Sequence, residues 1–296
     1  MAETSGMAEI RGLDVEKLLK GFSDEEIIFK RFVTVTPTSA REIRWYQKTS
    51  GYLDTTDTTG MTTSRMANVP QLAQPESIEQ SITRQTDYVK KYMVDSPVIS
   101  MEDMRDADID ILAMNIRDIV RGISRQVDSR IWEVLTEGRI AATTTGLITV
   151  SGGWATGGAT ANIIKDALRA KQTIRAQGYD PEGAQWFMNS TDHTNMMNWL
   201  INQAGSNIPA YTSAMIREPG VAMNILGLNV VVSENVTSNY NAVAQTKRAV
   251  TWKTFTPITS TTIVDPGIGT KIRCWEEGEA ILTDPKAVCL LSGSAA

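Results

Sequence analysis

The sequence has very little of the chemistry that metal proteins and disulfide-rich proteins use. Its 296 residues include one histidine, His193, and two cysteines, Cys274 and Cys289. Two cysteines are too few for a disulfide scaffold, and one histidine without a cysteine cluster does not match the ligand spacing of a transition-metal site. We therefore expect two small, buried cysteines, no metal ion and no cofactor.

Catalytic residues are equally scarce. His193 stands beside Asp192 in STDHTNMMNWL, at the start of a predicted helix. A catalytic pair of this kind needs a nucleophile, and neither cysteine has a local sequence that indicates one. A structural or exposed role for the histidine is the simpler interpretation, and we expect a protein that is not an enzyme.

Two further patterns are weak evidence for a site. Glu276, Glu277 and Glu279 surround Gly278, which predicts a solvated hairpin turn rather than an acid–base pair. The only glycine cluster, SGGWATGGAT at 151–160, has neither the lysine ending of a phosphate loop nor the spacing of a dinucleotide turn. It predicts a flexible connection.

The chain also has fewer basic than acidic residues. The chain has 29 basic and 34 acidic residues and a formal net charge of −5, whereas binding to nucleic acid depends on clustered lysine and arginine. Long apolar runs are missing too: the longest uncharged stretch, Ile140–Ile164, is built largely from threonine, glycine, alanine and serine. We expect a protein that is made in the cytoplasm, does not contact a membrane and does not bind nucleic acid tightly.

What the sequence does have is one very long helical pattern, at residues 101–138. Unbroken from Met101 to Glu137, such a helix would be roughly 55 Å long, while a compact chain of this length has a diameter of about 50 Å. Ser100 can cap its start, and Gly138 can end it. The acidic run 106–110 leaves two interpretations open, one continuous helix or two collinear ones. The apolar positions share one stripe and are Leu112, Ile116, Ile119, Val120, Ile123, Val127, Ile131 and Val134.

The opposite face of this helix carries a row of like charges. Arg117, Arg121 and Arg125 are four residues apart, and such a row is mildly unfavourable by itself. Met114 and Trp132 are expected on the same outer face, where isolated large apolar side chains are unusual if the helix meets only water. The face is either simply solvated, or it lies against another subunit or a polyanion.

The remaining pattern predicts a mixture of short strands and two more helices. Alternating residues predict strands within 32–46 and 76–99, with a threonine-rich loop between them. Helices are predicted at 162–177 and 191–202. A strand is predicted at 147–150, and buried strands are predicted at 184–188 and 225–235. Beyond residue 241 the sequence predicts strands separated by Pro257, by DPG at 265–267 and by DP at 284–285.

This order of elements resembles the major capsid proteins of tailed double-stranded DNA viruses, which have the Hong-Kong-97-like fold. The resemblance spans roughly residues 30 to 291, and the order of elements is more specific than any single motif. It rests on SPVISMEDMRDADIDI, which leads into the long helix, and on WEVLTEG at its end, followed by AQWFMNSTDHTNMMNWL, ILGLNVVVSEN and EGEAILTDPKAVCLL.

The resemblance implies an α+β fold with five parts. Such subunits assemble into hexamers and pentamers that form an icosahedral shell around packaged double-stranded DNA, without sequence-specific binding. The implied parts are an N-terminal arm at 1–30, an extended loop at 31–75 that reaches over a neighbour, a peripheral domain with the spine helix at 76–150, an axial domain at 151–244 and return strands of the peripheral domain at 245–296.

It also implies partners and contacts. We expect a separate scaffolding protein, a portal and decoration proteins, with the shell assembled in the host cytoplasm and found in the virion. Lys48 is the only lysine between residues 31 and 75, and with no partner to name for it we expect no covalent cross-link. The residues expected at assembly contacts are Arg41, Arg44, Trp45, Tyr46, Arg117, Arg121, Arg125 and Trp132.

Two alternatives stay open. An encapsulin-type shell of a bacterial nanocompartment shares this fold and differs in enclosing an enzyme instead of DNA. An α/β enzyme or ligand-binding protein with a β-rich second domain would need a convergent polar site, and the sequence contains none that can be assembled from its motifs.

Overall fold

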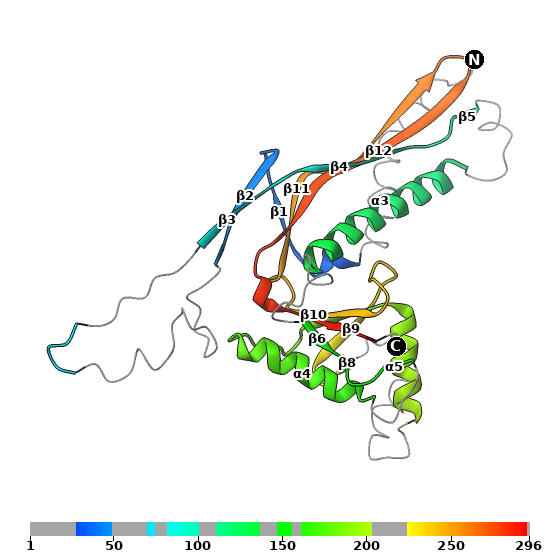
Figure 1. Cartoon of the computed structure of the whole chain (residues 1–296). Coiled ribbons are helices and arrows are strands. Elements are labelled where there is room, and N and C mark those ends of the chain that lie inside the picture. The colour runs from blue at the N-terminus through cyan, green and yellow to red at the C-terminus, as the bar shows by residue number, and fades with distance from the viewer. Residues whose placement is uncertain are drawn as a thin grey trace. The chain divides into compact units, whose positions relative to one another are not determined.

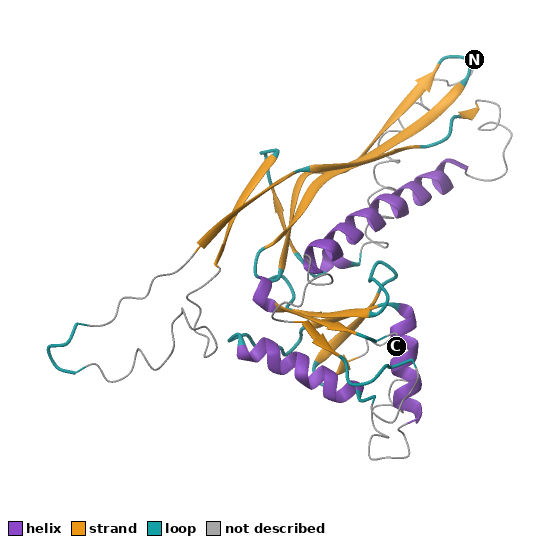
Figure 2. Cartoon of the chain, in the orientation of Figure 1, coloured by secondary structure: helices purple, strands orange, loops and turns teal. Residues whose placement is uncertain are grey.

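The computed structural model describes residues 28–48, 70–74, 82–100, 111–136, 147–155, 161–202 and 224–294. Helices and strands are both present, as the α+β prediction required (Figure 2). The chain divides into two compact units. The first unit combines Met1–Ile43, Asp87–Ile131 and Trp252–Ile281, and the second combines Arg44–Thr86, Trp132–Thr251 and Leu282–Ala296.

The first unit is built on a sheet with the strand order β1-β11-β12-β4, in which β5 also pairs with β12. The two long central strands, β11 and β12, run side by side (Figure 1), and β12 is antiparallel to β4 and β5. The strands are β1 (Thr34–Pro37), β4 (Lys90–Asp95), β5 (Ile99–Ser100), β11 (Val250–Asp265) and β12 (Gly269–Leu282).

The predicted break at Pro257 is wrong, because β11 is one strand of 16 residues that passes through this proline. A proline removes only one N–H group from the ladder of hydrogen bonds. A long strand with partners along both edges retains enough of the other bonds to continue.

The long helix α3 (Ile111–Thr136) follows the predicted apolar stripe. Ile116, Ile119, Val120, Ile123, Val127, Ile131 and Val134 are all buried, which confirms the helical period. Residues 101–110 and 137–138 lie outside the described residues. The choice between one helix and two depends on residues 101–110 and is therefore not tested.

The second unit contains a six-stranded mixed sheet (Figures 1 and 2). It also contains the helices α4 (Ile163–Ala176) and α5 (Ser190–Asn202), which confirm the helices predicted at 162–177 and 191–202. Its strand order is β6-β13-β10-β7-β9-β8. Both helices contribute to one apolar core with Trp154 and Trp186, whose rings meet edge to face at 6.0 Å. The strands are β6 (Leu147–Thr149), β7 (Gln185–Met188), β8 (Asn224–Ile225), β9 (Leu228–Val232), β10 (Tyr240–Ala244) and β13 (Val288–Ser292).

Shorter elements complete the described chain. β2 (Glu42–Lys48) pairs with β3 (Ile82–Tyr88) in a two-stranded sheet. The single-turn helices η1 (Phe29–Arg31) and η4 (Pro285–Ala287) precede β1 and β13. Within the described residues, no helix is long and apolar enough to cross a membrane.

Local chemistry explains where the elements of the second unit begin and turn. The side chain of Asn162 accepts the N–H of Lys165 at 2.9 Å and caps α4. The single strand predicted at 225–235 is instead the hairpin of β8 and β9. Leu226 and Gly227 both have positive φ angles, 55° and 80°, which is the geometry of a two-residue hairpin turn.

Both cysteines are fully buried, as predicted. Cys274 lies in β12 and Cys289 in β13. Burial, with a smaller contribution from the charge of Asp95, raises the pKa of Cys274 to about 12. This thiol is therefore protonated and unreactive at neutral pH.

Candidate functional site

The described residues hold no group of three or more histidine, cysteine, aspartate or glutamate side chains that could bind a metal ion. His193 is half-buried in the first turn of α5, and burial lowers the pKa of its imidazole. The neighbouring Asp192 is buried and accepts a hydrogen bond from the Ser294 hydroxyl at 2.9 Å. The aspartate thus ties the C-terminal segment to α5.

The prediction of a solvated turn at the glutamate cluster is wrong. Glu276, Glu277 and Glu279 lie within β12 and are only 1%, 5% and 0% exposed. Gly278 permits a close approach rather than a turn, because a Cβ atom there would lie 2.5 Å from the Trp252 ring. The period-two pattern that continues from TKIRCW to EAIL was the sequence signal for an unbroken strand.

Each buried glutamate has cationic partners within the first unit. Buried carboxylates require such partners, because an unpaired buried charge is strongly unfavourable. Burial raises the pKa of Glu279, and Arg130 opposes that shift. The pairs are Lys30 with Glu276, Arg41 and Lys91 with Glu277 at 3.5 and 3.4 Å, and Arg130 and Lys90 with Glu279 at 2.6 and 3.5 Å.

A fourth buried carboxylate in the first unit holds the chain before β1. Asp128 on α3 is 1% exposed and accepts backbone N–H bonds from Ile28, at 2.9 Å, and from Phe29 and Lys30. The ammonium group of Lys30 also lies 5.6 Å from the centre of the Trp252 ring. Residues 28–30 are therefore fixed to both α3 and the sheet.

Asp128 predicts a specific pH dependence. Burial raises its pKa from 3.8 to about 6, so protonation favours the folded state and stability falls as pH rises through 6. Between about pH 4.5 and 7.5, the wild type should lose about 2 kcal/mol more unfolding free energy than Asp128→Asn. Urea denaturation of both proteins at the two pH values measures the difference, and parallel losses would contradict this role.

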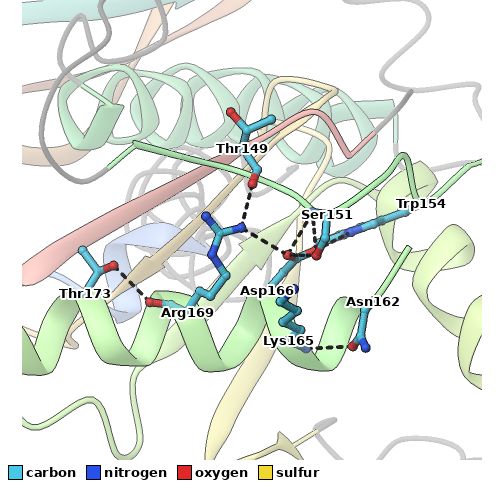
Figure 3. Close-up of polar contacts among 8 residues, drawn as sticks. All are labelled: Thr149, Ser151, Trp154, Asn162, Lys165, Asp166, Arg169 and Thr173. Carbon is cyan, nitrogen blue, oxygen red and sulfur yellow. Dashed lines mark hydrogen bonds and ion pairs between the residues drawn. The ribbon is translucent and has the colours of Figure 1, made fainter. Parts of the chain in front are cut away.

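In the second unit, the buried carboxylate of Asp166 organises the chain after β6. It accepts bonds from the Ser151 N–H at 3.0 Å, the Ser151 hydroxyl at 2.5 Å and the Trp154 indole N–H at 3.2 Å (Figure 3). The flexible connection predicted at 151–160 is wrong for its first part, because residues 151–154 are anchored to α4 by these bonds. Residues 156–160 lie outside the described residues.

The structure places the expected contact residues near β2 in different settings. Arg41 is mostly exposed, and its guanidinium group lies 4.9 Å from the Phe255 ring centre. Trp45 is half-buried and donates to the Leu282 carbonyl at 3.1 Å. Arg44 is exposed, and Tyr46 is 69% exposed. Tyr46 therefore presents most of its side chain at the surface.

The expected contact residues of α3 divide into two groups. Arg117, Arg121 and Arg125 are exposed, and Met114 is 58% exposed. Trp132 is not on an exposed face as predicted: it is 4% exposed, and its indole N–H donates to the Thr237 hydroxyl at 3.0 Å. Helical period alone placed it outward, but a segment distant in sequence covers this end of the helix.

Comparison with known families finds one match for most of the chain. A model of the family described as phage capsid protein matches residues 97–291. This range includes α3, α4 and α5 and the described strands from β5 to β12, together with all but the last residue of β13. No curated protein sequence matches the chain.

Solved structures resemble the whole fold at low sequence identity. A virus-like particle protein from Pyrococcus furiosus is 9% identical, with a TM-score of 0.62, over 95% of this chain and 99% of that one. The capsid of a native GTA particle, computed with C5 symmetry, is 15% identical, with a TM-score of 0.66 over 90% of both chains. The capsid structure of the cyanophage P-SCSP1u is 12% identical, with a TM-score of 0.63, over 91% and 89%.

Proposed function

This chain belongs to the phage capsid protein family and has the Hong-Kong-97-like fold of tailed-phage major capsid proteins, and from that premise we propose that it assembles into hexamers and pentamers of an icosahedral shell around double-stranded DNA. The observation that carries the proposal is the family match across residues 97–291. Similarity along nearly the full length of capsid and virus-like particle subunits supports it.

The geometry of such a shell follows from contacts between unlike surfaces. A contact between two different faces of one subunit generates a ring when the rotation closes. The GTA capsid was computed with C5 symmetry, which supports a five-fold ring for this fold. The net charge of −5 supports a shell that encloses DNA without adhering strongly to it.

The proposal assigns roles to the parts of the chain. Residues 31–75 form the loop that reaches over a neighbouring subunit, 76–150 and 245–296 form the peripheral domain, and 151–244 form the axial domain. In this proposal a scaffolding protein, a portal and decoration proteins are the further partners of the shell in the virion. Assembly takes place in the host cytoplasm.

The experiment that tests the proposal has two parts: sedimentation of the purified full chain, alone and with its scaffolding protein, and analysis of the contents of particles isolated from infected cells. We expect particles of many subunits in the first part, and particles that protect viral-length DNA from nuclease in the second. Small particles that contain a co-purified enzyme would instead identify a nanocompartment shell. A chain that remains monomeric at all concentrations and salt conditions, both alone and with the scaffolding protein, would refute assembly.

The exposed arginine row of α3 gives a prediction about assembly. Arg121→Gln with Arg125→Gln should lower the particle yield at least tenfold, because the row would lose its attraction to an acidic neighbour or polyanion. Far-UV circular dichroism should remain unchanged, since both side chains are exposed. Sedimentation measures the yield.

A matched control separates this effect from a change in net charge. Thr261→Glu with Thr262→Glu alters the charge by the same amount at exposed positions of β11, outside α3. This control should assemble normally. Equal yields from the wild type and both double variants would eliminate the arginine row as a contact.

A further inference from the structure

Two exposed apolar side chains stand out in the compact α/β part of the second unit. Among the described residues of 132–251 and 282–296, Leu168 and Val232 are the only large hydrophobic side chains that are exposed, at 51% and 38%. They lie on different elements, α4 and the end of β9. Their charged neighbours have opposite signs.

The first of these surfaces, the α4 patch, is cationic. It consists of the exposed residues Lys165, Leu168, Arg169, Gln172 and Arg175, which share the outer face of α4. The opposite face, with Ile163, Ala167, Ala170 and Ile174, is buried in the core. Leu168 is therefore an apolar anchor with three cationic residues around it.

Part of the α4 patch is held in place by the fold. The Arg169 guanidinium donates to the Thr149 carbonyl at 3.1 Å and lies 3.9 Å from the Asp166 carboxylate (Figure 3). Arg175 lies 3.1 Å from Glu182, which also pairs with the buried Lys171 at 2.7 Å. The guanidinium groups thus have preferred positions before any partner arrives, which lowers the entropy lost on binding.

The second surface, the β9 patch, is anionic and consists of Val232 and Glu234. The side-chain amide of Asn189 donates to a carboxylate oxygen of Glu234 at 3.3 Å and to the Val236 carbonyl at 3.0 Å. Asn189 is only 8% exposed, so this amide fixes the direction of the glutamate. The β9 patch therefore presents one apolar side chain and one oriented carboxylate.

We propose that the α4 patch of one subunit binds the β9 patch of a neighbouring copy of this chain. This inference rests on the proposed function and identifies one contact within it. Two α4 patches would repel each other, and so would two β9 patches, whereas the mixed pair joins opposite charges around two apolar side chains. A contact between unlike patches is head-to-tail, which is the arrangement that closes into rings.

A charge exchange tests the contact in the full chain. Lys165→Glu and Glu234→Lys should each reduce the particle yield at least tenfold, because each places like charges opposite one another. The double variant Lys165→Glu with Glu234→Lys should recover the wild-type yield to within threefold. Wild-type yields from both single variants, or a double variant no better than the weaker single one, would overturn the proposal.

A cysteine pair gives a second measurement that does not depend on complete shells. Under oxidation, Leu168→Cys with Val232→Cys should produce a ladder of disulfide-linked oligomers, while either single variant should remain monomeric. The native Cys274 and Cys289 are buried and leave this background low. If the cysteine variant formed a ladder but the wild type formed no shells, the contact would be supported and the proposed shell refuted. If the wild type formed shells but the cysteine variant formed no ladder, the shell would be supported and the contact refuted.

The DNA content of the particles shows whether the α4 patch binds nucleic acid instead of a neighbouring subunit. If the α4 patch instead contacted nucleic acid, Lys165→Glu would lower the DNA content of particles at an unchanged particle number. That result would overturn the contact between copies.

Discussion

Asp166→Ala is expected to lower the unfolding free energy of the second unit by about 4 kcal/mol. The substitution removes the acceptor of the buried Trp154 indole N–H and of the partly buried Ser151 N–H and hydroxyl. An unsatisfied buried polar group typically costs about 1–3 kcal/mol. Trp154 packs against Trp186, so tryptophan fluorescence during urea denaturation reports the loss directly.

Two variants on α4 serve as controls for this prediction. Asp166→Asn keeps one acceptor oxygen and should lose about half as much stability. Gln172→Ala changes an exposed position of the same helix and should stay within about 0.5 kcal/mol of the wild type. An Asp166→Ala protein as stable as Gln172→Ala would show that the carboxylate does not organise the segment after β6.

Glu279→Ala is expected to destabilise the first unit by about 3–5 kcal/mol, because it leaves the guanidinium group of Arg130 without its main partner. Glu279 is fully buried, and its carboxylate lies 2.6 Å from the Arg130 Nε atom. Asp87 lies 3.3 Å from Arg130 and still balances part of its positive charge in the variant. Chemical denaturation monitored by circular dichroism measures the change.

The double variant Glu279→Leu with Arg130→Met separates lost pairing from lost packing. Replacing both charges by apolar side chains of similar volume is often close to neutral, so this protein should be more stable than Glu279→Ala. If both variants lost the same free energy, the ion pair would not be the cause and shape alone would explain the loss.

Much of the fold could be predicted from local pattern. The stripe from Ile116 to Val134 has the helical period, and the whole stripe is buried. The strands at 184–188 and 147–150 and the helices that follow each of them were also predicted. These elements depend on period, caps and turn residues, all of which lie within a few positions along the chain.

The errors concern residues whose surroundings come from distant segments. Glu276 and Glu279 looked solvated because charged residues usually are, yet β12 lies between β11 and β4 and its carboxylates meet cations from other parts of the chain. Trp132 looked exposed by its angle on the helix, and Thr237 accepts its indole N–H. A pattern of neighbouring residues cannot reveal such partners, because they come from segments distant in sequence.

The surfaces proposed for assembly were predicted only in part. The four-residue spacing predicted an arginine row on the outer face of α3, and the three side chains are exposed in the structure. The importance of Asp166 was missed, although a carboxylate between Ile163 and Ala167 on an apolar stripe was a signal. Because Leu168 and Val232 lie on different elements, their opposite charge surroundings became visible only with the folded unit.

Electron cryo-microscopy of particles formed by the purified full chain, alone or with its scaffolding protein, tests directly whether this chain builds a shell. We predict closed icosahedral particles with five-fold and six-fold rings of this subunit. Folded protein that yields only monomers, open sheets or filaments across the same conditions would show that this chain does not build a shell.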